Sequence, residues 1–166
     1  MSLLKELVGR EFLAVFFLAA SGRRSIDISR ISSTNCTTKN NKLLFSLPRD
    51  KTNNKTVAFH VDWAEDSTLK PFVKRAKDEW QKARKDKCPF QSVKWHKIRR
   101  TSPAKLHSLR NRKAVMLLRS GAPEEEIQVR LGWASLDSLT RYTKMPRAMI
   151  DIFDSYDEFV QEVRSV

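Results

Sequence analysis

Cysteine is scarce in this chain. Its two cysteines, Cys36 and Cys88, lie far apart and belong to no CxxC or Cys/His pair. These are not the spacings by which proteins hold structural zinc, so we expect no metal site. The pattern instead favours two reduced thiols in a cytosolic or nuclear protein.

Long apolar runs are lacking too. The apolar run over residues 12–20 is too short to span a bilayer. Glu6 and Glu11 interrupt the region where a signal peptide would carry positive charge. We therefore interpret the run as a buried core helix and expect no membrane-spanning segment.

Acidic residues are few relative to basic ones: 19 Asp and Glu stand against 32 Lys and Arg, which gives a net charge of +13. An excess of this size indicates a polyanionic partner, with nucleic acid first and an anionic membrane surface as the alternative. The 166 residues suffice for one domain with a core, and the sequence shows neither an internal repeat nor a low-complexity linker.

Apolar periodicity and capping signals predict a largely helical chain. Residues 3–20 are expected to form one deeply buried helix that ends at Gly22, followed by a short helix through Ile31. Further helices are predicted over residues 66–85, 102–120, from 123, from 135 and over 146–164. The outward face of the helix over 66–85 is basic, either merely solvated or in contact with DNA, and carries Lys74, Arg75, Lys77 and Lys82.

Strand signals are confined to a short central region. Residues 43–47 and 56–61 are strand candidates, and the turn residues at 50–54 make them a hairpin. Residues 32–42 are expected to be a loop, and residues 86–101 a basic, irregular connector. The predicted fold class is mainly α with a small antiparallel β-sheet (α+β).

Three side chains suggest a site that binds a phosphate. His107 and Arg110 are three residues apart, so they share one face of a helix. Arg110, and Arg24 from a separate helix, can hold phosphate oxygens bidentately without losing charge. His107 can donate to the same phosphate or take a proton.

Three more residues complete a set that could cleave a DNA strand. Tyr142 supplies a phenol nucleophile, which would form a covalent phosphotyrosine. Lys51, at the hairpin turn, can act as the acid for the leaving oxygen if its pKa is lowered. Trp133 can donate its indole N–H to a phosphate oxygen. Each of these residues alone has a more ordinary structural interpretation, and only their joint spacing favours chemistry.

The set resembles the signature of the tyrosine recombinases (phage-integrase family). The second signature box of that family corresponds to His107-Ser108-Leu109-Arg110, Leu131-Gly132-Trp133 and Arg141-Tyr142-Thr143. The first box is similar to residues 21–28, with Arg24 at the first catalytic Arg and Asp27 as a local buttress for it. Arg23 stands where the family usually has an apolar residue. The resemblance leaves two candidates for the catalytic lysine, Lys51 and Lys55, and Lys51 is favoured.

The resemblance implies a tyrosine-recombinase catalytic-domain fold and a defined chemistry. Strands would be cleaved and rejoined through a 3′-phosphotyrosine intermediate, without ATP, metal or other cofactors. The partner would be double-stranded DNA, bound by a homotetramer of the full-length protein, whereas the fragment could be monomeric. Residues 1–166 would then be a single catalytic domain of a longer protein with an N-terminal DNA-binding domain, and the helix over 146–164 could dock on a neighbouring subunit.

Other cations are candidates for contact with the DNA backbone. They are Arg23, Lys55, Lys94, Lys97, Arg99 and Arg100. Two alternatives to a recombinase stay open: a type IB topoisomerase-like strand transferase, and a catalytically silent DNA-binding module of the same fold. The expected location is cytoplasmic or nucleoid-associated, or the nucleus or host cell if the source is eukaryotic or viral.

Overall fold

The structure, a computed structural model, describes residues 2–48, 56–101, 106–133, 135 and 137, with the side chains of residues 2, 101 and 107 left out. Several predicted features therefore lie outside the described residues: the turn at 50–54, the start of the helix over 102–120, most of the helix from 135 and the helix over 146–164. The described elements, in chain order, are α1 (Ser2–Glu6), α2 (Gly9–Ser21), α3 (Ser25–Ser29), η1 (Ser33–Asn35), β1 (Cys36–Lys39), β2 (Lys42–Leu47), β3 (Val57–Asp62), η2 (Ser67–Leu69), α4 (Lys70–Ala83), α5 (Trp95–Thr101), α6 (Leu106–Arg119) and α7 (Glu124–Leu131).

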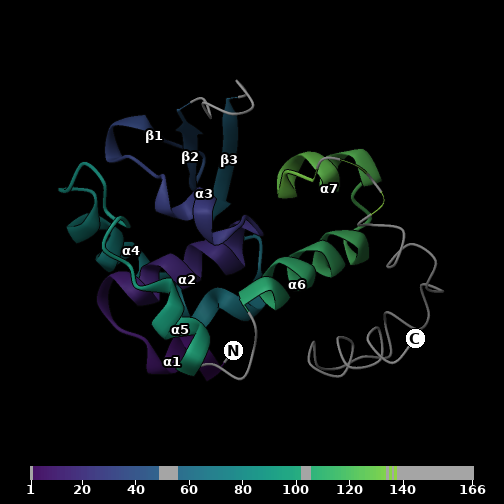
Figure 1. The fold of residues 1–166 in the computed structure, drawn as a ribbon. Helices are drawn as coiled ribbons and strands as arrows, with labels where there is room; N and C mark the ends of the chain where they lie inside the picture. Colours follow the sequence, from purple (N-terminus) through teal and green to yellow (C-terminus); the bar gives the residue numbers. More distant parts are fainter. Residues whose placement is uncertain (1, 49–55, 102–105, 134, 136, 138–166) are drawn as a thin grey trace.

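Helix α2 is the centre of the fold, as its apolar sequence predicted. Every residue from Phe12 to Ser21 is buried, and α4, α6 and β3 pack around the helix (Figure 1). Phe17 contacts the rings of Trp63, Trp80 and Phe90 with centroids 5.5–6.1 Å apart. Loss of such a fully buried ring costs about 3–5 kcal/mol, so α2 organises the larger of two hydrophobic clusters, the smaller one lying between α6 and α7.

The prediction of one helix over residues 3–20 is wrong in one respect. Val8 is extended (φ −132°, ψ 161°) and Gly9 has a φ of 56°, so the chain breaks between α1 and α2. Arg75 of α4, expected on the solvent face, stabilises this break. Its Nη2 donates to Leu7 O at 2.5 Å, and its guanidinium lies 3.8 Å from the centroid of the Phe12 ring. Arg75 is thus a packing residue rather than a surface cation.

The sheet has the predicted hairpin and one additional strand. Strands β2 and β3 pair antiparallel with Phe45 opposite Phe59, which confirms the hairpin. The expected loop over 32–42 is wrong, because it contains η1 and β1, and β1 pairs antiparallel with β2. Asn40 and Asn41, with φ of 48° and 60°, make the connecting two-residue turn. Two successive positive φ values are the requirement of a type I′ hairpin, which Asn tolerates.

The connector predicted over 86–101 contains a helix, α5, so the irregular interpretation is wrong for its second half. Ile98 is 2% exposed, and the Trp95 indole N–H donates to Ser29 Oγ at 2.7 Å. These contacts attach α5 to the end of α3. Its exposed cations, which include Arg99 and Arg100, are thereby held next to the short helix that carries Arg24 at its start.

Helices α6 and α7 confirm the predicted order after residue 105. Gly121 and Gly132 follow the two helices with φ of 82° and 68°, as helix-ending glycines do. The first turn of α7 holds Glu124, Glu125 and Glu126, whose charges suit the positive end of a helix dipole. Within the described part of the chain, every helix is too short or too polar to cross a membrane.

Candidate active site

Arg24 is placed by the start of α3. It is the N-cap residue of that helix, and Asp27 Oδ2 accepts from its backbone N–H at 3.3 Å and from its Nε at 3.5 Å. The Asp27 side chain is 2% exposed, whereas that of Arg24 is 59% exposed. The carboxylate therefore fixes the base of the arginine and leaves its outer nitrogens accessible. The prediction that Asp27 buttresses Arg24 is confirmed.

Arg110 enters the same region from α6. It is 5% exposed, and its Nη1 donates to the carbonyl of Gly22 at 3.3 Å. Burial first, and then the positive charge of Arg24, lower the pKa of Arg110 to about 10 against the opposing effect of Asp27. Arg110 still carries its proton at neutral pH, so a charged guanidinium is held at a buried position beside Arg24.

Trp133 is brought onto Arg110 by the end of α7. Gly132 terminates the helix in the left-handed conformation, and the backbone N–H of Trp133 returns to Gln128 O at 3.0 Å. The indole ring centroid then lies 5.6 Å from the Arg110 guanidinium carbon, within cation–π range. Arg24, Arg110 and Trp133, distant in sequence, therefore lie around one region as the predicted set requires.

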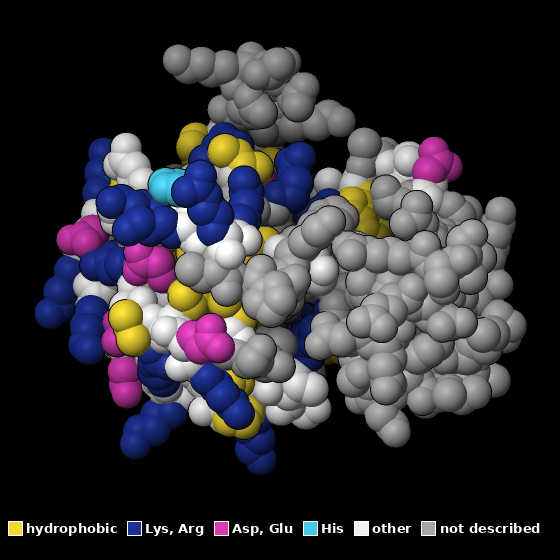
Figure 2. All heavy atoms as spheres, turned by 60° about the horizontal axis from the view of Figure 1, so that its bottom comes forward, with side chains coloured by type: hydrophobic (Ala, Val, Ile, Leu, Met, Phe, Trp, Pro, Cys, Tyr) yellow, Lys and Arg dark blue, Asp and Glu magenta, His cyan; other side chains and the backbone are white. Residues whose placement is uncertain are grey.

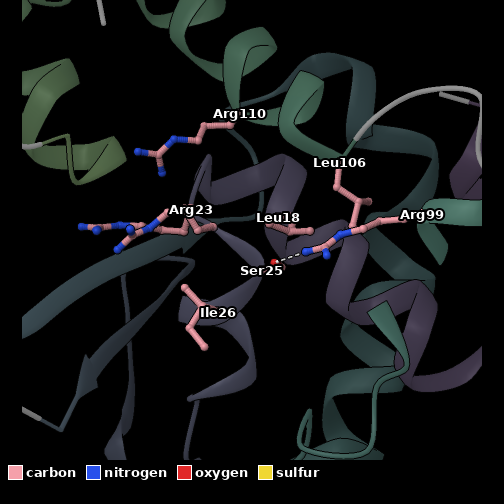
Figure 3. A pocket seen from close by; sticks show the side chains of 8 residues that line it. Leu18, Arg23, Ser25, Ile26, Arg99, Leu106 and Arg110 are labelled. Atoms are coloured by element: carbon pink, nitrogen blue, oxygen red, sulfur yellow. Dashed lines mark hydrogen bonds between the residues drawn. The ribbon is translucent and has the colours of Figure 1, made fainter. Parts of the chain in front are cut away.

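A pocket of about 490 Å³ opens at this region. It is lined by Leu18, Arg23, Arg24, Ser25, Ile26, Arg99, Leu106 and Arg110. Figure 3 shows Arg110 and Arg23 extending in one direction, while Arg99 reaches in from α5 and donates to Ser25 Oγ at 3.1 Å. Four guanidinium groups border this pocket and the one acidic residue that holds Arg24 is buried, so the pocket suits an anion.

Arg23, predicted to contact the DNA backbone, is 5% exposed. Its Nη2 donates to Ala58 O at 3.1 Å and to Val129 O at 3.2 Å, and its guanidinium lies 5.5 Å from the Phe59 ring centroid. Burial lowers its pKa. Among the described residues its partners are thus main-chain carbonyls, and a contact with phosphate stays a prediction.

The remaining predicted residues divide into two groups. Lys94, Lys97, Arg99 and Arg100 are exposed on α5 or just before it. Figure 2, which brings the lower side of Figure 1 forward, shows lysine and arginine side chains spread over this face with fewer acidic ones among them. His107 lies three residues before Arg110 on α6, but its side chain is not described. Lys51, Lys55 and Tyr142 lie outside the described residues.

The sequence reasoning missed an ion-pair network behind the site. Glu65 Oε2 accepts from Lys113 Nζ at 2.5 Å and from Arg130 Nη2 at 2.6 Å, and Arg130 Nη2 also lies 3.1 Å from His60 Nε2. These contacts lower the pKa of Glu65 to about 2 against its burial. Burial and the charge of Arg130 lower the pKa of His60, so its ring is neutral at pH 7 and can accept from Arg130. The sequence signal that could have indicated this network is the pair of acidic residues after β3, Glu65 and Asp66.

Comparison with solved structures identifies the fold. The chain is similar to the XerH site-specific recombinase bound to its difH substrate before cleavage, with a TM-score of 0.64 and 15% identity over 93% of this chain and 50% of XerH. A post-cleavage complex of XerH on palindromic difH gives 0.58, with 17% identity over 82% of this chain and 44% of that one. The catalytic domain of bacteriophage HP1 integrase gives 0.56, with 15% identity over 85% of this chain and 80% of that domain.

The chain therefore has the fold of a tyrosine-recombinase catalytic domain, as the resemblance implied. It spans about half the length of the XerH chain. No family model matches the sequence, and no curated protein sequence matches it either.

Proposed function

We propose that the chain is the catalytic domain of a site-specific DNA recombinase or integrase that cleaves and rejoins strands through a 3′-phosphotyrosine. One observation carries the proposal: Arg24 and Arg110 line a single pocket from two separate helices, with Trp133 packed on Arg110. The same fold occurs in XerH on difH DNA and in the HP1 integrase catalytic domain. Two arginines that can share one phosphate are the core of the predicted site.

The proposed reaction assigns a role to each predicted residue. The phenolate of Tyr142 attacks the scissile phosphorus, the bond to the 5′-oxygen breaks, and Lys51 or Lys55 protonates that oxygen. Arg24 and Arg110 hold the non-bridging oxygens as their charge rises. In the second step a 5′-hydroxyl attacks the phosphotyrosine, and a new phosphodiester forms as the tyrosine leaves.

Trp133 and His107 serve this reaction in different ways. The Trp133 indole lies against Arg110, so it can hold that guanidinium in place and offer its N–H to a phosphate oxygen. His107 belongs to the same helix one turn before Arg110 and would donate to the phosphate or take the phenol proton. No ATP, metal ion or other cofactor is required, because the covalent link stores the bond energy.

The proposed DNA path runs from the pocket along α5. Arg99 links the two, because it lines the pocket and also donates to Ser25 at the start of α3. Lys94, Lys97 and Arg100 extend the positive surface beyond it. Double-stranded DNA is the proposed partner, and the full-length protein would act as a homotetramer in which the helix over 146–164 docks on a neighbouring subunit.

The function is tested by covalent trapping on DNA. Because the target sequence is unknown, nicked suicide duplexes with a randomised central segment are incubated with the protein, and covalent adducts are recovered from a denaturing gel and sequenced. We expect an adduct with the wild-type chain and none with Tyr142→Phe. The other tyrosine offers a matched control, so Tyr156→Phe should form the adduct normally.

Three results separate the alternatives. An adduct that survives Tyr142→Phe, or none with wild type, would overturn the proposal, and binding without any adduct would favour the silent module. Adducts spread over unrelated sequences, with relaxation of supercoiled DNA by a monomer, would favour the topoisomerase-like enzyme. Arg110→Ala should lower the cleavage rate by about 10²–10³-fold, the cost of one lost donor to the developing charge.

A further inference from the structure

We infer that Arg23 is a positioning residue that fixes the Trp133 segment against the Arg24 and Arg110 site. The inference rests on the proposed function and concerns a residue that the sequence marks as an unusual cation and as a candidate for contact with the DNA backbone. Arg23 immediately precedes Arg24, yet its guanidinium turns away from solvent and is 5% exposed. Its contacts explain why an arginine occupies this buried position.

The Arg23 guanidinium joins strand β3 to the end of helix α7. Nη2 donates to Ala58 O of β3 at 3.1 Å and to Val129 O in the last turn of α7 at 3.2 Å. A cation at the carboxyl end of a helix is favourable because the last carbonyls carry partial negative charge. Arg23 therefore holds the end of α7 to the edge of the sheet, from the residue next to Arg24.

The end of α7 leads directly into Trp133, and Gly132 is shaped around Arg23. A Cβ at Gly132 would lie 2.0 Å from Arg23 Nη1 and 3.0 Å from its Cζ, so only glycine allows this approach. A reciprocal contact occurs at Gly22, where a Cβ would lie 2.2 Å from Leu131 Cδ2. The dipeptides Gly22-Arg23 and Leu131-Gly132 thus interlock, each glycine receiving the large side chain of the other pair.

This interlock connects the groups of the site. Arg110 donates to Gly22 O at 3.3 Å, and Trp133 lies 5.6 Å from the Arg110 guanidinium. Gly22 and Arg23 therefore determine where Arg110 and Trp133 lie relative to Arg24. Because a displacement of about 1 Å in a catalytic group can cost about 10²-fold in rate, this bridge affects catalysis through the positions of Arg110 and Trp133.

The test compares Arg23→Met, Arg23→Lys and the control Arg30→Met. Arg30 also donates to a carbonyl, Pro48 O at 2.5 Å, and its replacement removes the same charge outside the pocket. We expect Arg23→Met to lower the rate of adduct formation by about 10–100-fold while DNA affinity changes less than about threefold. The rate of adduct formation by Arg23→Lys should be closer to that of Arg23→Met than to that of wild type, because an ammonium group lacks the planar fork that spans both carbonyls. Arg30→Met should cleave within about twofold of wild type.

Two further measurements do not require cleavage, so a failed recombinase assignment leaves the positioning inference testable. In Arg23→Met, amide exchange at Gly132 and Trp133, whose N–H groups close the end of α7, should accelerate at least about tenfold, as local opening becomes easier. Gly132→Ala should destabilise the wild type more than it destabilises Arg23→Met, because the Arg23 guanidinium that would clash with the new Cβ is absent from that variant. Gly9→Ala gives the control, because Gly9 also has a positive φ (56°) but no neighbour within 4 Å of a Cβ.

If Arg23→Met forms the adduct and exchanges its amides at the same rates as wild type, the inference is overturned while the recombinase function stays intact. Full recovery by Arg23→Lys would also overturn it, because positive charge alone would then suffice. Equal effects of Gly132→Ala in both backgrounds would show that Arg23 and Gly132 are not coupled.

Discussion

Replacement of Glu65 by glutamine should destabilise the protein far more than replacement of its buried partner Lys113. Glu65 Oε2 accepts from Lys113 Nζ at 2.5 Å and from Arg130 Nη2 at 2.6 Å. The Lys113 side chain is 1% exposed, so in Glu65→Gln a buried cation loses its counter-ion and Arg130 loses one of its two carboxylate partners. Removing one partner of a buried pair costs about 3–5 kcal/mol, and we expect about 3 kcal/mol because Arg130 keeps its contact with Glu126.

Lys113→Met should cost only about 1 kcal/mol, because it removes a buried charge whose desolvation is unfavourable and leaves Glu65 paired with Arg130 at 2.6 Å. The pKa shifts of the two residues agree with this difference. The pKa of Glu65 falls to about 2 because its cationic partners stabilise the carboxylate. Burial lowers the pKa of Lys113, which means that the interior disfavours its charged form. The carboxylate is therefore the member that holds the network together.

The pH dependence has a defined sign. Because the folded-state pKa of Glu65 lies below its ordinary value of 4.5, its contribution is fully present above pH 4.5 and is lost as pH falls through about 2. The full shift corresponds to an upper value of about 3 kcal/mol, at 1.36 kcal/mol for each pH unit. The difference in unfolding free energy between wild type and Glu65→Gln should therefore shrink between pH 5 and pH 2.

Urea denaturation of wild type, Glu65→Gln and Lys113→Met at pH 7, 4 and 2.5 measures these differences. Glu79→Gln is the matched control, because Glu79 pairs with Lys82 at 3.4 Å and the Lys82 side chain is 70% exposed. Its replacement should change stability by less than about 0.5 kcal/mol. A cost for Lys113→Met equal to or above that of Glu65→Gln, or a difference independent of pH, would refute the reasoning.

Three other outcomes follow from the same contacts. Gly22 has a φ of 72°, and a Cβ there would lie 2.2 Å from Leu131 Cδ2. Gly22→Ala should therefore lower the free energy of unfolding, measured in urea, by about 3 kcal/mol or more. A loss of only about 1 kcal/mol would show that Leu131 moves aside. Asp27→Asn should slow adduct formation about tenfold with unchanged DNA affinity, because Arg24 loses its ionic buttress, and a normal rate would remove that role. DNA affinity, measured by fluorescence anisotropy from 50 to 200 mM salt, should fall steeply, and a flat response would show that the charge of +13 serves another purpose.

The parts of the fold that sequence predicted were those with strong local patterns. Helix α2 is apolar on all sides, and the glycines after α2, α6 and α7 end them where positive φ is required. Strands β2 and β3 alternate buried and open positions, so their period was visible. Arg24, Arg110 and Trp133 could be grouped because the motif carries their spacing, and their geometry then agreed.

The features that sequence did not predict depend on tertiary contacts. Three of the four residues of β1 are exposed, so the strand shows no apolar alternation and is fixed instead by its turn and by pairing with β2. Helix α5 has one fully buried apolar residue, Ile98, within a basic segment. Arg75 reads as a surface cation on its own helix, and only the break at Val8 gives it carbonyls to bind.

The cations around α6 differ in the chemistry of their partners, and this difference decides which of their charges are cancelled. Arg112 and Lys113 bind the carboxylates of Asp66 and Glu65, which cancel their charge. Arg110, on the same helix, donates to the carbonyl of Gly22. Arg23 likewise donates to the carbonyls of Ala58 and Val129.

A carbonyl satisfies a guanidinium hydrogen bond and orients the group without neutralising it, whereas a carboxylate would compete with a phosphate for the same cation. Arg24 illustrates the intermediate case, because buried Asp27 holds its backbone and Nε at 3.3 and 3.5 Å while its outer nitrogens stay open. The interior of this fold therefore keeps net positive charge beside the pocket and cancels it one helical turn away. An anion in the pocket would complete the electrostatics that the chain itself leaves unbalanced.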